Sequence, residues 1–515
     1  MRGLVWVAAI AAAVSVSSAS LAPAYADDAA LCANAKGDAA IAACTRSINS
    51  GRWRGRDLAI AHNNRGIVYH DKGDLDRALV DFDAAIRLDP KFANTYNSRG
   101  HVYIGKGDLD HALADFDAAI RLDPKFAWAY NNRGIVYHDK GDPDHALADY
   151  SEAIRLDAKD ASTYNNRGLV YRDKGDLDHA LADYNEAIRL DAKYAHAYNG
   201  RGNVYHDKGD PDRALADYSE AIRLDAKDAS AYNGRGVVYR DKGDLDHALA
   251  DYNEAIRLDA KYTRAYNGRG RVYRYKGDLD HALADYSEAI RLDPKLTLAF
   301  SNRGAVYLER GDLDHALADY NEAINLDPKY ANAFNDRGDV YRDRGDFDHA
   351  LADYDEAIRL DPKSAWEFMG RGSVALYRGD LAKALADLSQ ATALSPKDAY
   401  PPIWLDIAGQ RSGLASSLGQ TIAQVDLTKW PAPVIRMFLG QLTPAAVLAA
   451  ADDPDAVKKN GQVCEANLYS GEFVLRSGAK DEAARLFKTA ADTCPKSFIE
   501  WSAANFELKA LGITP

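Results

Sequence analysis

The dipeptide Arg-Gly recurs ten times at a constant spacing of 34 residues, from Arg65-Gly66 to Arg371-Gly372. No insertion or deletion interrupts this period. A fixed period of this length is typical of a helical solenoid, in which each repeat buries its apolar face only against its neighbours. Such an array presents a long surface rather than one enclosed active site. The sequence therefore indicates a binding protein.

Each repeat predicts two antiparallel helices. One representative repeat contains two stretches with the i, i+4, i+7 spacing of a helical stripe, at Tyr130, Gly134 and Tyr137 and at Ala146, Tyr150 and Ala153. Between them, Gly141 suits a turn, and Asp142 can cap the free N–H groups of the second helix. Gly134 and Ala146 are small, so the two helices can approach closely.

The order aromatic-x3-Gly-x2-Tyr, then Ala-x3-aromatic, Ala and Pro resembles the tetratricopeptide repeat. Ten units fit the pattern over residues 59–398; the first has His62 at the leading aromatic position, and all have arginine where leucine is common. The resemblance implies an all-α fold, a right-handed superhelical solenoid of ten to eleven helix hairpins followed by a helical C-terminal module.

The two ends of the chain differ from the repeats. Residues 1–26 are predicted to be a secretory signal peptide, with one early arginine, an apolar run and an Ala-Tyr-Ala cleavage site. Residues 27–58 are expected to form a capping hairpin. Residues 399–515 form the predicted C-terminal module, which includes an eleventh hairpin over residues 464–497. We expect an exported, soluble, periplasmic protein without a lipid anchor, because Cys32 lies beyond the cleavage site.

The C-terminal module carries a second resemblance. Residues 399–462 contain Pro401-Pro402, Trp404 and Trp430-Pro-Ala-Pro433, and residues 464–471 and 479–487 follow with a small-residue pattern. Together they resemble the C-terminal region of NlpI-type bacterial envelope proteins. That resemblance implies an adaptor that brings peptidoglycan hydrolases and proteases together, often as a dimer.

Four cysteines in an exported chain predict two disulfide bonds. The two cysteines of each pair stand at similar distances on either side of a predicted hairpin turn, which favours Cys32–Cys44 and Cys464–Cys494. The sequence leaves other connectivities open. The spacings match no common zinc pattern.

The repeated arginine is predicted to be structural. Within a hairpin, Arg65 should lie near Asp81, and the same pair recurs in every repeat, because a partly buried guanidinium needs a carboxylate acceptor. This predicts a ladder of ion pairs formed by Arg65, Arg99, Arg133, Arg167, Arg201, Arg235, Arg269, Arg303, Arg337 and Arg371. A basic groove is the alternative reading of these arginines.

A ligand is better sought on the neighbouring stripe of the first helix. By resemblance to other tetratricopeptide arrays, this stripe lines the concave face, where asparagines bond a peptide backbone and cations hold carboxylates. A solvated polar face is the alternative. The predicted groove residues are Asn131, Asn165, Asn199, Asn233, Asn267, Asn335, His138, His206, Arg172, Arg240, Arg271, Arg274 and Arg342.

Several classes of function are disfavoured. The histidines of the repeated Asp-His-Ala-Leu motif would lie about one helix diameter apart, roughly 10 Å, too far to share a metal ion. We find no catalytic or phosphate-binding motif and expect no cofactor and no enzymatic activity. A net charge of −13 without a basic tract argues against nucleic acid.

These features predict a non-catalytic periplasmic scaffold that binds proteins or extended peptides of the cell envelope and links hydrolases and proteases. It can form a homodimer through its C-terminal module and has no membrane-spanning segment. The alternative is an accessory scaffold in envelope polysaccharide assembly or export.

Overall fold

The computed structural model describes residues 23–513 of the 515-residue chain. The predicted signal peptide thus lies almost entirely outside the described residues. Within them, the chain forms 29 helices and no strand, as the all-α prediction requires. It divides into two compact units, one ending at Ala260 and one beginning at Lys261; they are called the N-terminal and C-terminal units below.

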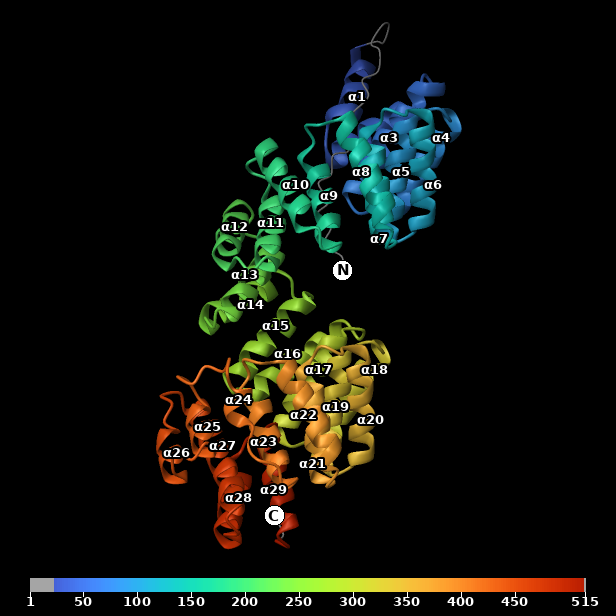
Figure 1. The fold of residues 1–515 in the computed structure, drawn as a ribbon. Helices are drawn as coiled ribbons and strands as arrows, with labels where there is room; N and C mark the ends of the chain where they lie inside the picture. Colours follow the sequence, from blue (N-terminus) through green and yellow to red (C-terminus); the bar gives the residue numbers. More distant parts are fainter. Residues whose placement is uncertain (1–22, 514–515) are drawn as a thin grey trace. The chain divides into compact units, whose positions relative to one another are not determined.

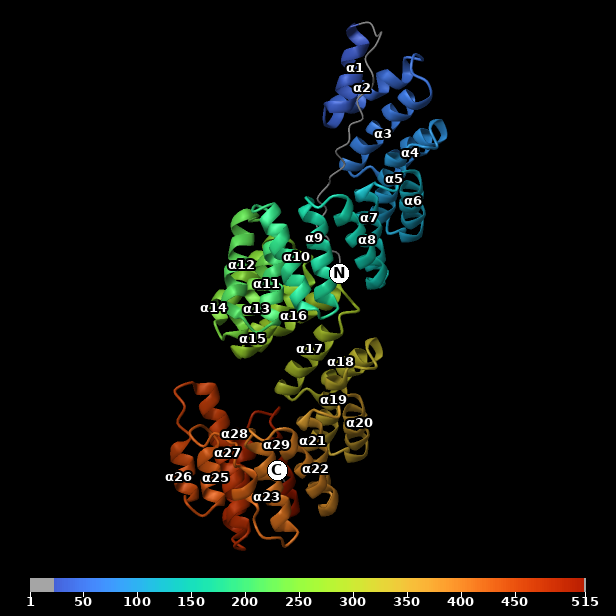
Figure 2. The ribbon, with the colours of Figure 1, turned by 45° about the horizontal axis from the view of Figure 1, so that its top comes forward.

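Helices follow one another as antiparallel pairs within each unit, as Figures 1 and 2 show. The N-terminal unit contains α1 (Pro23–Asn34), α2 (Gly37–Asn49), α3 (Gly55–Asp71), α4 (Leu75–Leu88), α5 (Ala93–Lys106), α6 (Leu109–Leu122), α7 (Ala127–Asp139), α8 (Pro143–Leu156), α9 (Ala161–Asp173), α10 (Leu177–Leu190), α11 (Ala195–Asp207), α12 (Pro211–Leu224), α13 (Ala229–Asp241) and α14 (Leu245–Leu258). The C-terminal unit contains α15 (Thr263–Tyr275), α16 (Leu279–Leu292), α17 (Thr297–Arg310), α18 (Leu313–Leu326), α19 (Ala331–Arg344), α20 (Phe347–Leu360), α21 (Ala365–Tyr377), α22 (Leu381–Leu394), α23 (Tyr400–Arg411), α24 (Leu418–Thr421), α25 (Ala432–Phe438), α26 (Pro444–Ala450), α27 (Ala456–Leu475), α28 (Lys480–Thr493) and α29 (Ile499–Ala510).

The turn inside each hairpin follows from two residues. Gly141 has φ 77°, a left-handed conformation that ends α7 at little cost for a residue without Cβ. The side chain of Asp142 accepts a hydrogen bond from the backbone N–H of His145 and so caps α8. Pro143 occupies the first turn of α8, where its missing N–H leaves no bond unmade.

The two helices of a hairpin meet through a glycine and an aromatic ring. A Cβ added to Gly134 would lie 2.8 Å from Cε1 of Tyr150, so only glycine allows this approach. Tyr150 is 1% exposed. The same contact joins Gly66 to Phe82 and recurs along the array, and it extends to Gly471 and Phe487 in the hairpin of α27 and α28. The largest buried side chain of the repeat is therefore the aromatic residue of the second helix.

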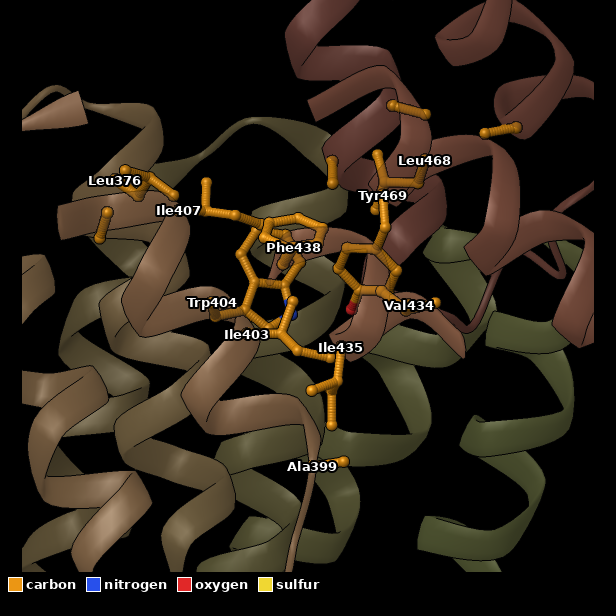
Figure 3. Close-up of a cluster of buried hydrophobic side chains, with 14 of the residues drawn as sticks. Leu376, Ala399, Ile403, Trp404, Ile407, Val434, Ile435, Phe438, Leu468 and Tyr469 are labelled. Carbon is orange, nitrogen blue, oxygen red and sulfur yellow. The ribbon is translucent and has the colours of Figure 1, made fainter. Parts of the chain in front are cut away.

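A larger apolar core lies in the C-terminal unit, between the last repeats and α23, α25 and α27. Figure 3 shows Trp404 of α23, Phe438 of α25 and Tyr469 of α27 meeting there. The rings of Trp404 and Tyr469 are 6.2 Å apart in an edge-to-face arrangement, which aromatic pairs favour. This core fixes α27 on the end of the array.

Both disulfide bonds join the residues favoured by the sequence, Cys32 with Cys44 and Cys464 with Cys494. The first links α1 to α2. The second links α27 to the end of α28. Among the described residues, no helix has both the length and the apolar character that crossing a bilayer requires.

Candidate functional site: the face of the first helices

The predicted arginine–aspartate pair is present in all ten hairpins. In the third hairpin, Nε and Nη2 of Arg133 donate to the two carboxylate oxygens of Asp149 at 2.8 and 2.7 Å. This bidentate geometry is the strong form of the interaction. The ten pairs are Arg65–Asp81, Arg99–Asp115, Arg133–Asp149, Arg167–Asp183, Arg201–Asp217, Arg235–Asp251, Arg269–Asp285, Arg303–Asp319, Arg337–Asp353 and Arg371–Asp387.

The same guanidinium also reaches the preceding hairpin, which the sequence reasoning missed. Nη1 of Arg133 donates to Asp117 of α6 at 2.6 Å. In eight of the nine contacts observed the acceptor stands 16 residues before the arginine and is aspartate, serine or asparagine; for Arg65 it is Thr45, which stands 20 residues before. The contacts observed are Arg65–Thr45, Arg99–Asp83, Arg133–Asp117, Arg167–Ser151, Arg201–Asn185, Arg235–Ser219, Arg303–Ser287, Arg337–Asn321 and Arg371–Asp355.

The structure gives a reason for the histidine at the leading aromatic position of the first hairpin. His62 replaces the usual aromatic residue, and its Nδ1 lies 2.7 Å from Oδ1 of Asp81, which Arg65 also binds. Burial raises the pKa of Asp81, but the bonds from Arg65 and His62 outweigh it, so the pKa is lowered. The carboxylate is therefore ionised at neutral pH.

Half of the predicted asparagine row, namely Asn131, Asn199 and Asn267, is committed to contacts between hairpins. The side-chain N–H of Asn166 donates to Oδ1 of Asn131 at 3.2 Å, and Thr163 donates to the same oxygen. Asn131 is only 6% exposed, so its prediction as a groove residue is wrong. Comparable bonds join Asn132 to Asn97, Asn302 to Asn267 and Asn199 to Ser230.

Most of the predicted cations are also paired with the next hairpin. Nε2 of His138 lies 2.9 Å from Asp173, and the equivalent pairs are Arg172–Asp207, His206–Asp241 and Arg274–Glu309, at 2.6, 3.0 and 2.7 Å. Asp241 also binds Arg240 of its own helix; burial raises the pKa of Asp241, but these two partners outweigh it and lower that pKa. These contacts form a second ladder, which joins neighbouring hairpins.

Arg342 is the second predicted groove residue that the structure contradicts. Its side chain is 3% exposed and binds Asp339 and Asp343. It is buried because α29 covers this end of the face, through Ser502 of α29, which donates to Asp343. A one-dimensional repeat pattern could not show that a segment far along the chain covers it.

Four of the predicted groove residues have polar side-chain atoms that lack a strong hydrogen-bond partner among the described residues. Oδ1 of Asn233 has no hydrogen-bond partner among the described residues. The side chains of Asn165 and Asn335 bond only weakly to their own neighbours, at 3.3 and 3.4 Å. Arg271 makes a 3.5 Å contact with the hydroxyl of Tyr275, which is 58% exposed. Arg271 therefore retains donors for a ligand.

Comparison with known families decides the classification. Models described as "TPR repeat" and "Tetratricopeptide repeat" match segments that run from residue 66 to residue 364 and together cover more than half of the chain. The chain belongs to the tetratricopeptide repeat family. The matched segments are 66–107, 100–141, 168–209, 202–240, 238–273, 270–309 and 304–341 for the first model and 127–160 and 331–364 for the second.

Solved tetratricopeptide structures resemble parts of the chain. One is a tetratricopeptide repeat protein from Parabacteroides merdae, with 22% identity, a TM-score of 0.39, and coverage of 46% of this chain and 93% of the other. The Cut9–Hcn1 structure matches with 16% identity, TM-score 0.46, and 72% and 92% coverage. YrrB, described as having an unusual peptide-binding site, matches with 27% identity, TM-score 0.28, and 36% and 95% coverage. A search of curated proteins finds no match. The NlpI-type resemblance of residues 399–515 stays a prediction.

The histidines of these tetratricopeptide units have a structural partner. The ring of His179 stacks on Tyr171 of the first helix with centroids 5.1 Å apart, and its Nδ1 lies 2.7 Å from the capping Asp176. Six other hairpins repeat the stack, and the two that have arginine place Arg77 and Arg213 over the equivalent tyrosine. The signal in the sequence was that histidine and arginine, both with flat polar side chains, alternate at this position. No group of metal-binding side chains converges within the described part of the chain.

Proposed function

We propose that this protein is a non-catalytic scaffold of the cell envelope that binds an extended peptide or a segment of a protein on the face of its first helices. Tetratricopeptide proteins bind protein or peptide partners, and their fold is generally a non-catalytic scaffold. The contact pattern supports a narrower binding region than the sequence suggested, because the two ladders use most polar groups of the face.

The observation that carries the proposal is the exposed face of α15. This helix contains no acidic residue, and two of its arginines, Arg264 and Arg271, make no ion pair among the described residues, unlike Arg274, which binds Glu309. Arg264 is exposed, and Tyr275 is exposed beside Arg271. Two arginines seven residues apart lie on one side of a helix. Planar guanidinium groups bind carboxylates in bidentate fashion, so a partner segment with acidic side chains fits this face.

The envelope location rests on the ends of the chain. Two disulfide bonds favour an oxidising compartment, and the predicted signal peptide and NlpI-type resemblance support the periplasm. We propose hydrolases and proteases of the envelope as the partners that the scaffold links, and the C-terminal module as the place of self-association.

The test is affinity capture from envelope extract with residues 27–515, followed by mass spectrometry. A variant with Arg264→Ala and Arg271→Ala should lose the partner at least tenfold. Arg291→Ala is the matched control, because this exposed arginine of α16 pairs with Glu288 on the second-helix side. Equal capture by all three proteins would refute the α15 site. If the captured proteins belong to polysaccharide export and are lost with the same variant, the alternative function, a scaffold in polysaccharide assembly or export, would be supported.

A further inference from the structure

The C-terminal helix α29 covers part of the face proposed for partners, and the inference below rests on that proposed function. Ser502 donates to Asp343, and the ring of Phe506 lies 5.1 Å from Phe347 and 4.6 Å from Tyr377. Figures 1 and 2 both place α29 between α27–α28 and the hairpin of α21 and α22. Three of the last hairpin helices, α19, α20 and α21, thus contact one side of α29.

The covered positions belong to the same repeat register as the second ladder. Asp343 stands at multiples of 34 residues from Asp173, Asp207 and Asp241, each of which binds a cation of the preceding hairpin. Asp343 instead binds Arg342 and the hydroxyl of Ser502. Tyr377 occupies the next repeat of this position. A helix of the chain itself therefore occupies the surface where a ligand would lie.

The opposite side of α29 rests on an acidic interior. Glu500 and Glu507 of α29 stand seven residues apart, as do Glu465 and Glu472 of α27, and all four are 5–6% exposed. Two residues seven apart lie on one face of a helix. Glu472 and Glu507 share one nitrogen of Arg411, Nη2, at 2.8 and 2.7 Å. Glu465 accepts bonds from the hydroxyl of Tyr400 and from Nε1 of Trp430, at 2.9 and 2.7 Å, and Glu500 accepts one from Tyr469 at 2.8 Å.

The charges around this interior do not balance when all four carboxyl groups ionise. Arg411 of α23 is the cation in contact with them, and it neutralises one of its two partners. Arg476, which directly follows α27, binds Asp406 and also interacts with the charge of Glu472. Arg342 of α19 binds Asp339 and Asp343, although its charge also favours ionised Glu500. Tyr377, Tyr400 and Tyr469 face the cluster as neutral phenols. Buried like charges in one site favour protonation of one member.

Burial and the neighbouring carboxylate act together. Burial and the like charge of Glu500 raise the pKa of Glu465 to about 8. Burial also raises the pKa of Glu500. Burial and the charge of Glu472 raise the pKa of Glu507 to about 7. An exposed glutamate, as in an undocked α29, titrates near 4.3. The docked arrangement therefore favours the protonated forms of these carboxyl groups.

We propose that α29 is a proton-held latch over a docking surface for an amphipathic helix of a partner. Protonation of Glu465 removes its repulsion with Glu500 and keeps α29 docked; when the proton passes to solvent, the two carboxylates repel and α29 leaves. The disulfide of Cys464 with Cys494 fixes α28 on α27, so the four residues before α29 act as the hinge. The surface uncovered consists of Asp343, Phe347 and Tyr377, and it accepts a helix with an aromatic residue at the place of Phe506.

The sign of the pH effect follows from linkage. The pKa values of Glu465 and Glu507 are raised in the docked state, so their contribution to docking is fully present below the undocked value and is lost as pH rises through about 7 to 8. Opening releases a proton from each of these two groups, so the opening equilibrium rises by up to about a hundredfold per pH unit between roughly pH 5 and 7 and about tenfold per pH unit between roughly pH 7 and 8.

Hydrogen exchange of the full chain, measured at pH 5.5, 7.0 and 8.5 and corrected for intrinsic rates, tests the latch. Protection of amides in residues 499–510 should fall at least tenfold per pH unit below about pH 8, while that of α12 in the N-terminal unit stays constant. In Glu465→Gln the fall should become about tenfold shallower per pH unit, since the amide keeps an acceptor without a charge. Glu500→Gln is the second variant if the first does not fold. Glu482→Gln, an exposed residue of α28 paired with Arg485, is the control. Protection independent of pH in the wild type, or unchanged pH dependence in the folded Gln variant, would overturn the latch.

The docking surface has a separate test. A fluorescent peptide of residues 496–510 carrying Glu500→Gln and Glu507→Gln should bind the full chain at pH 8.5 and at least tenfold more weakly at pH 5.5. The same peptide with Phe506→Ala should not bind at either pH. Absence of binding at pH 8.5 would overturn the docking surface. Partner capture through α15 does not depend on either result, so failure here and failure of the proposed function are distinguishable.

Discussion

Nη1 of Arg133 lies 2.6 Å from Oδ1 of Asp117, a carboxylate of the preceding hairpin, while the rest of the guanidinium holds Asp149 of its own hairpin. One side chain thus joins three helices. The stability of a solenoid depends on each repeat and on its contacts with its neighbours, and this arginine contributes to both. Its invariance within the chain follows from packing rather than from ligand binding.

Replacing Arg201 tests this ladder. Arg201→Leu leaves Asp217, which is 6% exposed, as a buried carboxylate without its bidentate partner. Breaking such a pair costs about 3 kcal/mol, whereas removing both charges costs less. Arg201→Leu should therefore destabilise more than the double variant Arg201→Leu, Asp217→Leu in urea unfolding. A double variant worse than the sum of the two single ones would show that the pair does not act as a unit.

The glycine that follows each arginine gives a second prediction. Gly134→Ala places a Cβ 2.8 Å from Cε1 of the buried Tyr150, so the ring or the helix must shift. Overpacking of this kind costs about 1–3 kcal/mol. Gly105→Ala in α5 is the matched control, because its Cβ would meet only a leucine methyl at 3.5 Å, and alanine is the better helix former. Thermal melting should show a lower midpoint for Gly134→Ala only; equal midpoints would count against the close approach.

The fold could be predicted from the sequence because every local signal recurs with one period. Glycine, aspartate and proline define the turn of α7 and α8, and the spacing of Tyr130, Gly134 and Tyr137 defines the buried stripe. The pairing of Arg133 with Asp149 followed from the same register. Its third bond, to Asp117, could not be predicted because the acceptor changes between aspartate, serine and asparagine and so shows no fixed motif.

The repeated histidine gives a third prediction. His179 stacks on Tyr171 and bonds the capping Asp176, and Arg213 takes the equivalent place over Tyr205. His179→Arg should therefore preserve stability, whereas His179→Ala should lower it by about 0.5–1.5 kcal/mol, the range of an aromatic pair. Chemical unfolding distinguishes the two variants. Equal losses in both would mean that the stack contributes nothing beyond the helix cap.

The candidate site was harder to predict than the fold. Asn131 and Arg342 have the register of a groove residue, but Asn166 uses the first and α29 buries the second. Register fixes which side of a helix a residue occupies. It does not fix how far the next hairpin reaches across that side, nor which distant segment packs over it, because both depend on tertiary packing.

The stability of the C-terminal unit should depend on pH through Asp336. Burial, and then the charge of Asp339, raise the pKa of this carboxyl group on α19 to about 7. The folded value lies above that of the unfolded chain, so its stabilising contribution is complete below about pH 4 and is lost as pH rises through about 7. Urea unfolding at pH 5.5 and 8.0 should show a loss of stability in the wild type. The loss should be smaller by about 1–2 kcal/mol in Asp336→Asn, given about 1.4 kcal/mol per unit of pKa. Glu322→Gln on α18 removes one carboxylate away from Asp336 and Asp339 and serves as the control. A pH dependence in Asp336→Asn equal to that of the wild type would assign the loss to other groups.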